Sequence, residues 1–480
     1  MSQFVDILLL LIFIYVVAYN LATLTLLTLS LSETSAVARA RRARVARGPH
    51  TPPPLQPSIT VVIPAYNEEP VIVASVGSIL AGTYEPMRVV VVDDGSTDGT
   101  SAALDAAYDL VELPIGGGFA LETEPVERLS ISRRDPRLRV VRKANGGRSD
   151  AVNAGIAVAR HDLIAVTDAD SVLEPDAIAL AVAAFTADPS RVVACGGIVR
   201  IANGGRFVDG RLVEPRVKVR GIEATQTVEY LRGFLGSRIA WARLNALVII
   251  SGAFGVFRRD FLVESGGLSK QTLGEDMELT LRLYHQLRPA HPEMRVAFVP
   301  DAVCWTEAPS KLSALRSQRI RWHVGLIDNL RLHRAMLGRH FGRVGRIALP
   351  YAILFEAVAP VIGLVGSVLV VGLLVFGGAT WWFVVALALA AVLLGQIQTA
   401  GAILVEEVGF RRYRSRDLLL LGLWSVLELF WYRPLTLLWR VWAMVLLLVG
   451  RRPEWGTIPR GAALGTGDEA PKSQTLPLPR

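Results

Sequence analysis

The sequence predicts an α/β domain with a mostly parallel sheet, fused to transmembrane helices. From Ser58 onward, short β-branched runs alternate with helical stretches, which is the pattern of a parallel sheet covered by helices. Long apolar stretches lie near both ends of the 480-residue chain. Hydrophobic residues make up 51% of the sequence and the mean hydropathy is +0.39, which is higher than in an ordinary soluble enzyme.

The charges indicate which partners the protein binds, and the cysteines indicate in which compartment it folds. The net charge is +8, and the arginines cluster beside hydrophobic segments, which favours lipid headgroups and a nucleotide diphosphate over nucleic acid. Cys195 and Cys304 are the only cysteines, so they make no disulfide framework and agree with a reducing cytoplasm. The seven histidines form no metal-ligand spacing with them, which argues against a zinc site.

The N-terminal residues 1–31 are predicted to form a transmembrane helix. Phe4–Leu31 is long enough to cross a membrane, is too long for a signal peptide and lacks a convincing small-residue cleavage site. The arginines between Arg39 and Arg47 then place the following side in the cytoplasm by the positive-inside rule. Residues 32–57 are expected to form a basic and proline-rich cytoplasmic linker, in which Gly48–Pro57 is stiff and extended.

The C-terminal residues 347–450 are predicted to form a second membrane region. Ile347–Phe376 and Trp381–Val405 are each long enough to span, and the arginines from Arg411 to Arg416 return the chain to the cytoplasm. Leu418–Val449 is interrupted by a basic residue and a proline, which predicts either one span plus an interfacial helix or a broken re-entrant pair. Beyond it, residues 451–480 have the composition of a disordered tail.

Between these membrane segments, residues 58–310 are expected to form the α/β domain. The expected strands are Ile59–Ile63, Val89–Val92, Leu138–Val141, Leu163–Thr167 and Val192–Ile198. The expected helices are Val71–Leu80, Thr97–Ala107, Asp150–Ala159 and Asp176–Phe185. Leu110–Pro136 breaks this rhythm with glycines and charges, so we expect an inserted surface loop there. Acidic residues follow the second and fourth strands, at the edge where open α/β sheets bind ligands.

Four short motifs follow one another along the chain. They are Asp93-Asp94-Gly95-Ser96, Asp168-Ala169-Asp170, Gly274-Glu275-Asp276 and Gln318-Arg319-Ile320-Arg321-Trp322. The set resembles the processive family 2 glycosyltransferases, the membrane synthases of cellulose, chitin, hyaluronan and poly-N-acetylglucosamine. The resemblance covers roughly residues 58–345. It implies a GT-A-type nucleotide-sugar-binding domain that uses a UDP-sugar and a divalent metal ion.

The resemblance assigns the donor-binding roles to residues that follow the first strands. Tyr66, in Pro64–Glu68 after the first strand, would lie against uracil, and Glu68 would belong to the same nucleotide site. Asp94 would hydrogen-bond the uracil. Arg148 stands where the family commonly has a lysine that reaches the nucleotide, and it keeps the charge on a wider planar group. A polar turn at Asp94 and a glycine-rich turn before Arg148 are the plain structural alternatives.

Asp168 and Asp170 are the candidate metal ligands. Hard divalent ions take oxygen ligands and retain waters, so one or two carboxylates and two phosphate oxygens suffice for Mg²⁺ or Mn²⁺. By resemblance Asp170 is the direct ligand, while Asp168 assists or touches the nucleotide. The alternative is a simple turn at the end of a strand.

Asp276 is the candidate catalytic residue. It opens the helix expected over Asp276–Leu287, and by resemblance it is the general base that takes the proton of the acceptor hydroxyl. Glu275 would shape the acceptor pocket. Gly274 departs from the threonine usual in the family, which we expect to loosen the local turn. Ser251 stands where the family has a loop that touches the acceptor.

Residues 311–346 are expected to form amphipathic interfacial helices that carry the last motif. A helix from about Ser313 brings Gln318 and Arg321 to one face, and Gln318 and Trp322 as well. Arg321 would clamp the diphosphate, Gln318 would bind the nucleotide sugar, and Trp322 would offer a flat surface to the acceptor. An apolar stripe suggests that the helix lies on the inner leaflet; it comprises Leu312, Leu315, Ile320, Val324, Ile327 and Leu330. The alternative is a basic interfacial helix with a membrane-surface tryptophan.

The combined prediction is a membrane-embedded, inverting glycosyltransferase. It would lie in the plasma or inner membrane as a multi-pass protein with a cytoplasmic catalytic domain. It would add β-linked sugars from a UDP-sugar, UDP-GlcNAc or UDP-Glc, to a growing glycan and export the chain through its own helices, with an accessory export subunit as a further partner. Two other interpretations stay open: a non-processive enzyme acting on a membrane lipid, and a transport or assembly subunit with an inactive transferase domain.

Overall fold

The computed structural model describes residues 3–46, 56–116, 120–208, 211–218, 221–376 and 381–453. Helix α1 (Gln3–Ala46) continues beyond residue 31, so the first half of the predicted linker is helical, and the boundary of the membrane span stays a prediction. The reason is local: residues 32–46 contain neither glycine nor proline and are rich in alanine and arginine, which are strong helix formers. Most of the proline-rich part of the linker and of the predicted tail lies outside the described residues.

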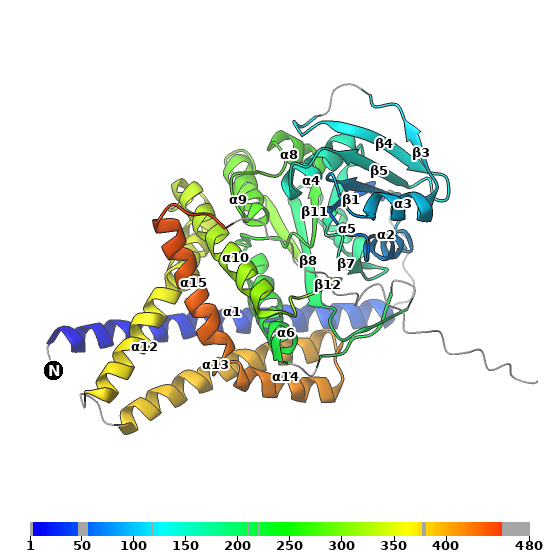
Figure 1. Ribbon diagram of the computed structural model, residues 1–480. Coiled ribbons are helices and arrows are strands. Elements are labelled where there is room, and N and C mark those ends of the chain that lie inside the picture. Colours follow the sequence, from blue (N-terminus) through cyan, green and yellow to red (C-terminus); the bar gives the residue numbers. More distant parts are fainter. Residues whose placement is uncertain are drawn as a thin grey trace, which may run out of the picture.

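One ten-stranded sheet organises the α/β domain (Figure 1). In spatial order its strands are β3 (Leu110–Leu113), β4 (Val126–Ser132), β5 (Leu138–Lys143), β2 (Met87–Asp93), β1 (Ile59–Ala65), β6 (Leu163–Thr167), β11 (Phe254–Arg258), β8 (Val192–Ile201), β12 (Arg295–Thr306) and β7 (Ser171–Leu173). The pairing makes β4, β11 and β7 antiparallel to the other strands. The predicted α/β class with a mostly parallel sheet is therefore confirmed.

Helices cover both faces of this sheet. Along β1, Val61 belongs to one hydrophobic core and Val62 to the other, and neither is exposed to solvent. Strands buried on both faces read as continuous β-branched runs, which is why they could be located from sequence. The helices of the domain are α2 (Ile72–Leu80), α3 (Thr100–Tyr108), α4 (Arg148–Val158), α5 (Ala177–Ala187), α6 (Gly221–Gly233), α7 (Ile239–Arg243), α8 (Arg259–Glu264) and α9 (Glu275–Leu287).

The segment Leu110–Pro136 is not a surface loop, so that prediction is wrong. Its ends form β3 and β4, an antiparallel pair that extends the sheet beyond β5. β4 lies between β3 and β5, and its leucine and β-branched residues are partly buried, so β3 and not β4 is the edge strand. The glycines that suggested a loop lie in the connection between the two strands.

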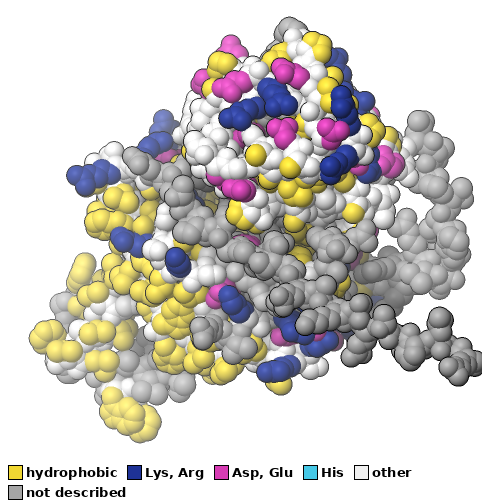
Figure 2. Space-filling view, turned by 45° about the vertical axis from the view of Figure 1, so that its right-hand side comes forward, with side chains coloured by type: hydrophobic (Ala, Val, Ile, Leu, Met, Phe, Trp, Pro, Cys, Tyr) yellow, Lys and Arg dark blue, Asp and Glu magenta, His cyan; other side chains and the backbone are white. Residues whose placement is uncertain are grey.

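The remaining long helices, which include the most apolar ones, lie below and beside the α/β domain in Figure 1. They are α10 (Leu312–Leu332), α12 (Ala359–Val375), α13 (Trp381–Gly409), α14 (Ser415–Leu427) and α15 (Tyr432–Leu448). Gln3–Arg39 and Val344–Val375 are each long and apolar enough to cross a membrane. Figure 2 shows hydrophobic side chains gathered on this lower part, whereas charged side chains lie over the α/β domain.

Helices α14 and α15 are bent by 57° relative to each other, so the predicted interruption of the last apolar segment is confirmed. The bend comes just before Arg433-Pro434. Pro434 then occupies the first turn of α15, where a missing N–H group costs no helical hydrogen bond. A bend of this size fits a broken span or a re-entrant pair, and of these the sequence predicted the re-entrant pair.

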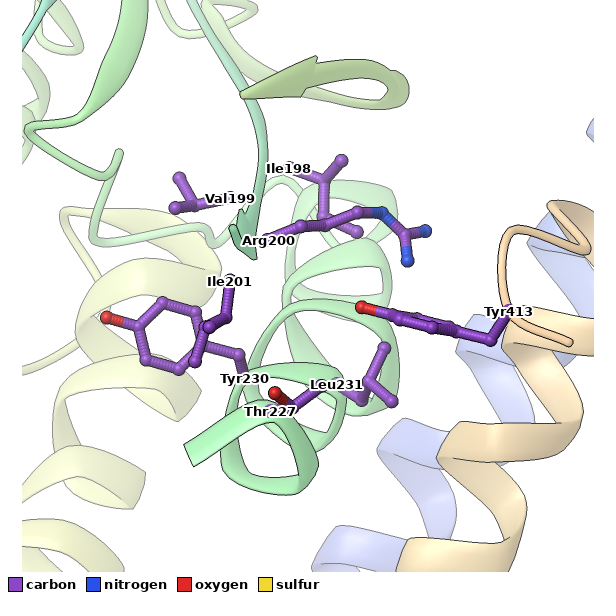
Figure 3. A pocket seen from close by; sticks show the side chains of 8 residues that line it. All are labelled: Ile198, Val199, Arg200, Ile201, Thr227, Tyr230, Leu231 and Tyr413. Carbon is purple, nitrogen blue, oxygen red and sulfur yellow. The ribbon is translucent and has the colours of Figure 1, made fainter. Parts of the chain in front are cut away.

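Polar contacts join α13 and the segment that follows it to the α/β domain. Arg200, at the end of β8, donates to Glu406 of α13 over 2.6 Å, and both side chains are buried. Beyond α13, Arg412 pairs with Glu174 over 2.5 Å. Figure 3 shows a small enclosed cavity at this junction, of about 10 Å³, lined by Ile198, Val199, Arg200, Ile201, Thr227, Tyr230, Leu231 and Tyr413. Such a volume holds at most about one water molecule, so the cavity is a packing gap and no ligand site.

The start of α9 packs on α10 through two glycines. A Cβ atom added to Gly325 would lie 2.8 Å from the Gly274 nitrogen and 3.0 Å from its Cα, so the two backbones are in direct contact. The Asn329 side chain also donates to the Gly274 carbonyl over 2.8 Å. Glycine at position 274 therefore permits close packing, and the expectation that it loosens the turn is wrong.

This contact predicts that Gly325→Ala destabilises the protein. Overpacking of this kind costs about 1–3 kcal/mol, which outweighs the roughly 1 kcal/mol that alanine gains over glycine in a helix. Gly422, in α14, has open space around the same position, so Gly422→Ala is the matched control and should be neutral or stabilising. The midpoint of thermal unfolding in detergent checks this. Equal midpoints for the two variants would show that the glycine contact is not tight.

Candidate active site

The carboxyl ends of β1 and β2 present the residues predicted to hold a nucleoside. The Asp94 N–H donates to the carbonyl of Ala65 over 2.9 Å, which places the ends of the two strands side by side. Tyr66 follows at once and is 43% exposed, so its ring is accessible to a ligand. Glu68 is buried, and its backbone N–H donates to the Thr100 hydroxyl over 2.9 Å.

Asp94 is held by the segment that precedes α4. Its Oδ1 accepts from the Gly146 N–H over 3.1 Å and its Oδ2 from the Gly147 N–H over 2.7 Å. Gly147 has φ +84°, a left-handed conformation that glycine adopts without strain. The carboxylate of Asp94 thus fixes the loop that leads directly into Arg148.

Lys143, which the sequence analysis did not single out, completes this corner. Its ammonium is fully buried and lies 2.6 Å from both Asp94 and Asp150. Burial by itself would lower the pKa of Lys143, but the hydrogen bonds and charges of the two carboxylates raise it. The signal that could have revealed it is a lysine at the carboxyl end of a parallel strand, the edge at which the other site residues lie.

Arg148 joins three separate parts of the site. Its Nε and Nη2 donate to Asp168 Oδ1 over 3.0 and 2.7 Å. Its Nη2 also donates to the Gly252 carbonyl over 2.7 Å, and its Nη1 donates to Glu275 Oε1 over 2.9 Å. Burial opposes the charge, but the carboxylates of Asp168 and Glu275 outweigh it and raise the pKa of Arg148, so it stays cationic. The predicted contact of Arg148 with a nucleotide stays a prediction, since four of its donor interactions are with the protein.

Asp168 and Asp170 follow the end of β6, as predicted. The side chain of Asp168 is 32% exposed and meets Arg148 through Oδ1 only, whereas Asp170 is buried and accepts from Thr306 Oγ1 over 3.4 Å. In the described ranges, no group of three or more His, Cys, Asp or Glu could hold a metal ion. Two carboxylates at an open sheet edge still suit a hard divalent ion whose remaining ligands are phosphate oxygens and waters.

Asp276 and Glu275 occupy the first turn of α9, beside Arg148. Burial raises the pKa of Asp276, while hydrogen bonds from Met277 and Gly252 and the charges of Arg148 and Arg238 partly offset it. Burial likewise raises the pKa of Glu275, against the charge of Arg148. A carboxylate with a raised pKa is a better proton acceptor, as a general base requires.

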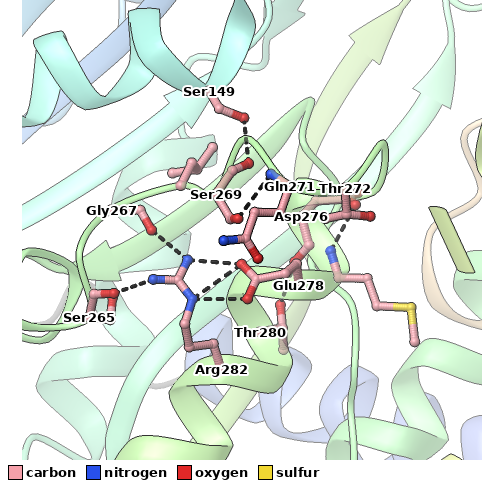
Figure 4. Close-up of polar contacts among 12 residues, drawn as sticks. Ser149, Ser265, Gly267, Ser269, Gln271, Thr272, Asp276, Glu278, Thr280 and Arg282 are labelled. Atoms are coloured by element: carbon pink, nitrogen blue, oxygen red, sulfur yellow. Dashed lines mark hydrogen bonds and ion pairs between the residues drawn. The ribbon is translucent and has the colours of Figure 1, made fainter. Parts of the chain in front are cut away.

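The loop before α9 is anchored on both sides (Figure 4). Arg282 of α9 binds Glu278 and the backbone carbonyls of Ser265 and Gly267. Across the loop, the Ser149 hydroxyl donates to the Ser269 carbonyl over 3.0 Å. These contacts tie the start of α9 to α4, and therefore tie Asp276 to the segment that carries Arg148.

Helix α10 carries the last motif, and its residues lie in different environments. Arg321 is buried and donates to Ser317 Oγ over 3.0 Å. The negative charge of Glu275 favours the charged form of Arg321. Trp322 is 47% exposed, and Gln318 accepts a hydrogen bond from Arg319 over 2.9 Å. Arg319 was not predicted to matter.

The apolar stripe of α10 faces the protein over most of its length. Ile320 and Val324 pack with Ala443 of α15, and Leu315 and Ile327 are also buried. The interior of the protein, and not a lipid leaflet, therefore covers the middle of the stripe. The expectation that this stripe rests on the inner leaflet is wrong for these four residues.

Ser251 precedes β11, and its carbonyl accepts from the Phe254 N–H over 3.1 Å. Its neighbour Gly252 contributes the carbonyl that binds Arg148. The structure thus places this loop beside Arg148 and the carboxylates that it binds, Asp168 and Glu275. The predicted contact of Ser251 with an acceptor stays a prediction.

Two related family models match overlapping parts of the chain. Residues 60–264 match the family Glycosyl transferase family 2, and residues 163–395 match Glycosyl transferase family group 2. The chain is 25% identical over 305 residues to a poly-beta-1,6-N-acetyl-D-glucosamine synthase of Staphylococcus aureus (strain COL), covering 63% of this chain and 62% of that protein. It is 26% identical over 275 residues to the probable glycosyltransferase YdaM of Bacillus subtilis (strain 168), covering 56% and 55% of the two chains.

Among solved structures, the mannosyltransferase PcManGT from Pyrobaculum calidifontis, in complex with GDP-Man and Mn²⁺, aligns with a TM-score of 0.48 and 20% identity. The alignment covers 91% of this chain and 100% of that one. The chain spans about 62% of the length of the first curated relative.

The Arg148 geometry predicts that Arg148→Lys is damaging, although lysine is common at this position in the resembling family. Arg148 binds Asp168, Gly252 and Glu275 through three separate nitrogens of a planar group, and the single nitrogen of a lysine ammonium does not reproduce these positions. Each lost charged hydrogen bond costs about 1.5–3 kcal/mol, so turnover should fall at least about tenfold. Arg142→Lys, on the exposed side of β5, is the control. Wild-type turnover in Arg148→Lys would mean that only the charge is needed, as for a direct nucleotide contact.

Proposed function

Because residues 60–264 form a glycosyl transferase family 2 domain, we propose that this chain transfers a sugar from a UDP-sugar to a growing β-linked glycan. The observation that carries the proposal is the junction at Arg148. This one side chain binds the Asp-x-Asp motif and the Glu-Asp motif, and it directly follows the loop that holds Asp94. Donor and acceptor chemistry would therefore meet at one edge of the sheet.

In this proposal the donor lies across the carboxyl ends of β1, β2 and β6. Tyr66, Glu68 and Asp94 hold the nucleoside, while Asp168 and Asp170 would hold Mg²⁺ or Mn²⁺. Such an ion, when bound, neutralises charge on the diphosphate and on the leaving UDP. Arg321, whose charge is attracted by Glu275, binds the diphosphate from α10 together with Gln318.

Asp276 performs the proton transfer. The acceptor hydroxyl attacks the anomeric carbon from the face opposite UDP, its oxygen forms the new C–O bond, and its proton passes to Asp276. The bond between the anomeric carbon and the phosphate oxygen breaks, so UDP leaves with the electron pair and the configuration inverts. The raised pKa of Asp276 means that the base becomes protonated, and turnover is lost, at a higher pH than for an ordinary aspartate.

A glycan acceptor is favoured over a single transfer to a lipid by the exposed indole of Trp322, which suits repeated binding of sugar rings. Glu275 and Ser251 would complete the acceptor pocket. The name of the Staphylococcus aureus relative, a poly-beta-1,6-N-acetyl-D-glucosamine synthase, supports UDP-GlcNAc as the donor, with UDP-Glc as the alternative. The retention of all acidic motifs argues against an inactive transport or assembly subunit.

The proposed setting is the plasma or inner membrane, with the α/β domain in the cytoplasm. Two apolar helices long enough to span and a bent pair support a multi-pass arrangement. The arginines that follow the first span support the orientation by the positive-inside rule. Export of the product through these helices, with or without an accessory subunit, belongs to the same proposal.

Release of UDP by the purified protein, measured over a panel of UDP-sugars, tests the proposed activity. We expect UDP release with one donor, dependent on Mg²⁺ or Mn²⁺, and a ladder of glycan products. A single product extractable into organic solvent would support lipid glycosylation instead. No UDP release with any donor would contradict the proposal.

Two conservative variants separate binding from chemistry. Asp170→Asn should abolish turnover and weaken metal-dependent UDP binding together, because it removes a charge that holds the ion. Asp276→Asn should keep UDP-sugar binding and lose transfer by about 10²–10⁴-fold, because only the proton acceptor is removed. Calorimetric UDP titrations with Mn²⁺, run beside turnover assays, check both. Full UDP affinity in Asp170→Asn, or near-normal turnover in Asp276→Asn, would remove that residue from its role.

A further inference from the structure

Arg319 is a buried arginine inside the last motif, and the sequence gives it no role. Only 2% of its surface is exposed. Its Nη2 donates to Glu229 Oε2 of α6 over 2.5 Å and to the Tyr432 hydroxyl of α15 over 2.9 Å. The Tyr432 hydroxyl also donates to Glu229 Oε2 over 2.5 Å. These three groups form a closed triangle that joins α6, α10 and α15.

This arrangement is costly if it serves stability alone. Among the described residues, Arg319 Nε is buried without a hydrogen-bond partner. A buried ion pair commonly stabilises a fold no better than well-packed apolar residues would. The position within the motif therefore calls for a role besides packing.

The guanidinium of Arg319 touches two of the predicted ligand-binding residues. Its central carbon lies 4.3 Å from the centre of the Trp322 ring, in a cation–π contact. It therefore supports one face of the indole, while 47% of Trp322 remains exposed. The exposed part is what an incoming sugar ring can reach.

Arg319 also sets the orientation of the Gln318 amide. Its Nη1 donates to Gln318 Oε1 over 2.9 Å. Because a guanidinium carries donors and no acceptor, the amide oxygen must face Arg319. The amide NH₂ of Gln318 is then the group available to a ligand, and it can donate to sugar hydroxyl or phosphate oxygens.

We propose that Arg319 is a positioning residue for the acceptor glycan, held in place by Glu229 and Tyr432. It fixes the face of Trp322 and the donor end of Gln318 at the same time. This inference rests on the proposed glycosyl transfer and adds the residues that orient its acceptor site. Through Tyr432, at the start of α15, it also links that site to the bend between α14 and α15.

Arg319→Lys tests the proposal, since lysine keeps the charge but loses the planar stacking surface. Arg200→Lys is the matched control, because Arg200 is equally buried and pairs with Glu406 away from the site. Tyr432→Phe removes one hydroxyl from the triangle without changing charge. The measurements are UDP affinity, hydrolysis of the donor by water, KM for an acceptor oligosaccharide and product length.

We expect Arg319→Lys to retain UDP affinity and donor hydrolysis, while the acceptor KM rises about tenfold and the products become shorter. Tyr432→Phe should change the same quantities in the same direction, by less. Normal acceptor KM and product length in Arg319→Lys would overturn the proposal. A parallel loss of UDP affinity, hydrolysis and elongation, as expected for Arg200→Lys, would assign Arg319 a structural role only.

A readout that needs no turnover separates this inference from the proposed function. The fluorescence contributed by Trp322 is obtained by subtracting the emission of the Trp322→Phe variant from that of the wild-type protein. In an Arg319→Lys background this difference should be quenched more strongly by acrylamide, because the guanidinium no longer covers one face of the ring. Unchanged quenching would overturn the positioning role even if the wild type transfers sugar. Absence of transfer by the wild type would refute the proposed function and leave this test intact.

Discussion

The site depends on one largely covered guanidinium that is shared among three acidic or carbonyl partners. Arg148 begins α4 directly after the Gly146–Gly147 turn, and the backbone of that turn binds Asp94. The side chain then binds Asp168 after β6, Gly252 before β11 and Glu275 at the start of α9. Segments more than 100 residues apart in sequence are thereby held together, so Asp168 and the Glu275-Asp276 pair lie at a common edge of the sheet.

The second constraint is the packing of α9 and α10. Gly274 and Gly325 let the backbone at the start of α9 contact the backbone of α10 directly. Side chains at these two positions would move the Glu-Asp motif away from the motif that ends in Trp322. Arg319 in turn attaches α10 to α6 and α15. Because α15 is half of the bent apolar pair, the end of the site formed by α10 is joined to the apolar helices, whereas the end that carries Asp94 rests on the sheet.

Sequence reasoning succeeded where the physical signal is local. The buried strands β1, β2 and β6 are continuous apolar runs that end in polar residues, so both their existence and the edge that carries the site could be predicted. It failed where long-range contacts decide. The hairpin β3–β4 depends on pairing with β5, and Lys143 matters only because Asp94 and Asp150 meet at its ammonium. The role of Gly274 in packing could not be predicted, because its partner Gly325 is 51 residues away in the sequence.

The most direct test of the account is a cryo-electron microscopy structure of the full chain in detergent or nanodiscs with UDP and Mn²⁺. The account predicts density for uracil between Tyr66 and Asp94, and a metal at Asp170 next to the diphosphate. It also predicts that Arg148 still bridges Asp168 and Glu275, with Asp276 and Trp322 on the far side of the diphosphate. Nucleotide bound away from the ends of β1, β2 and β6, or a diphosphate that displaces Arg148 from Glu275, would contradict it.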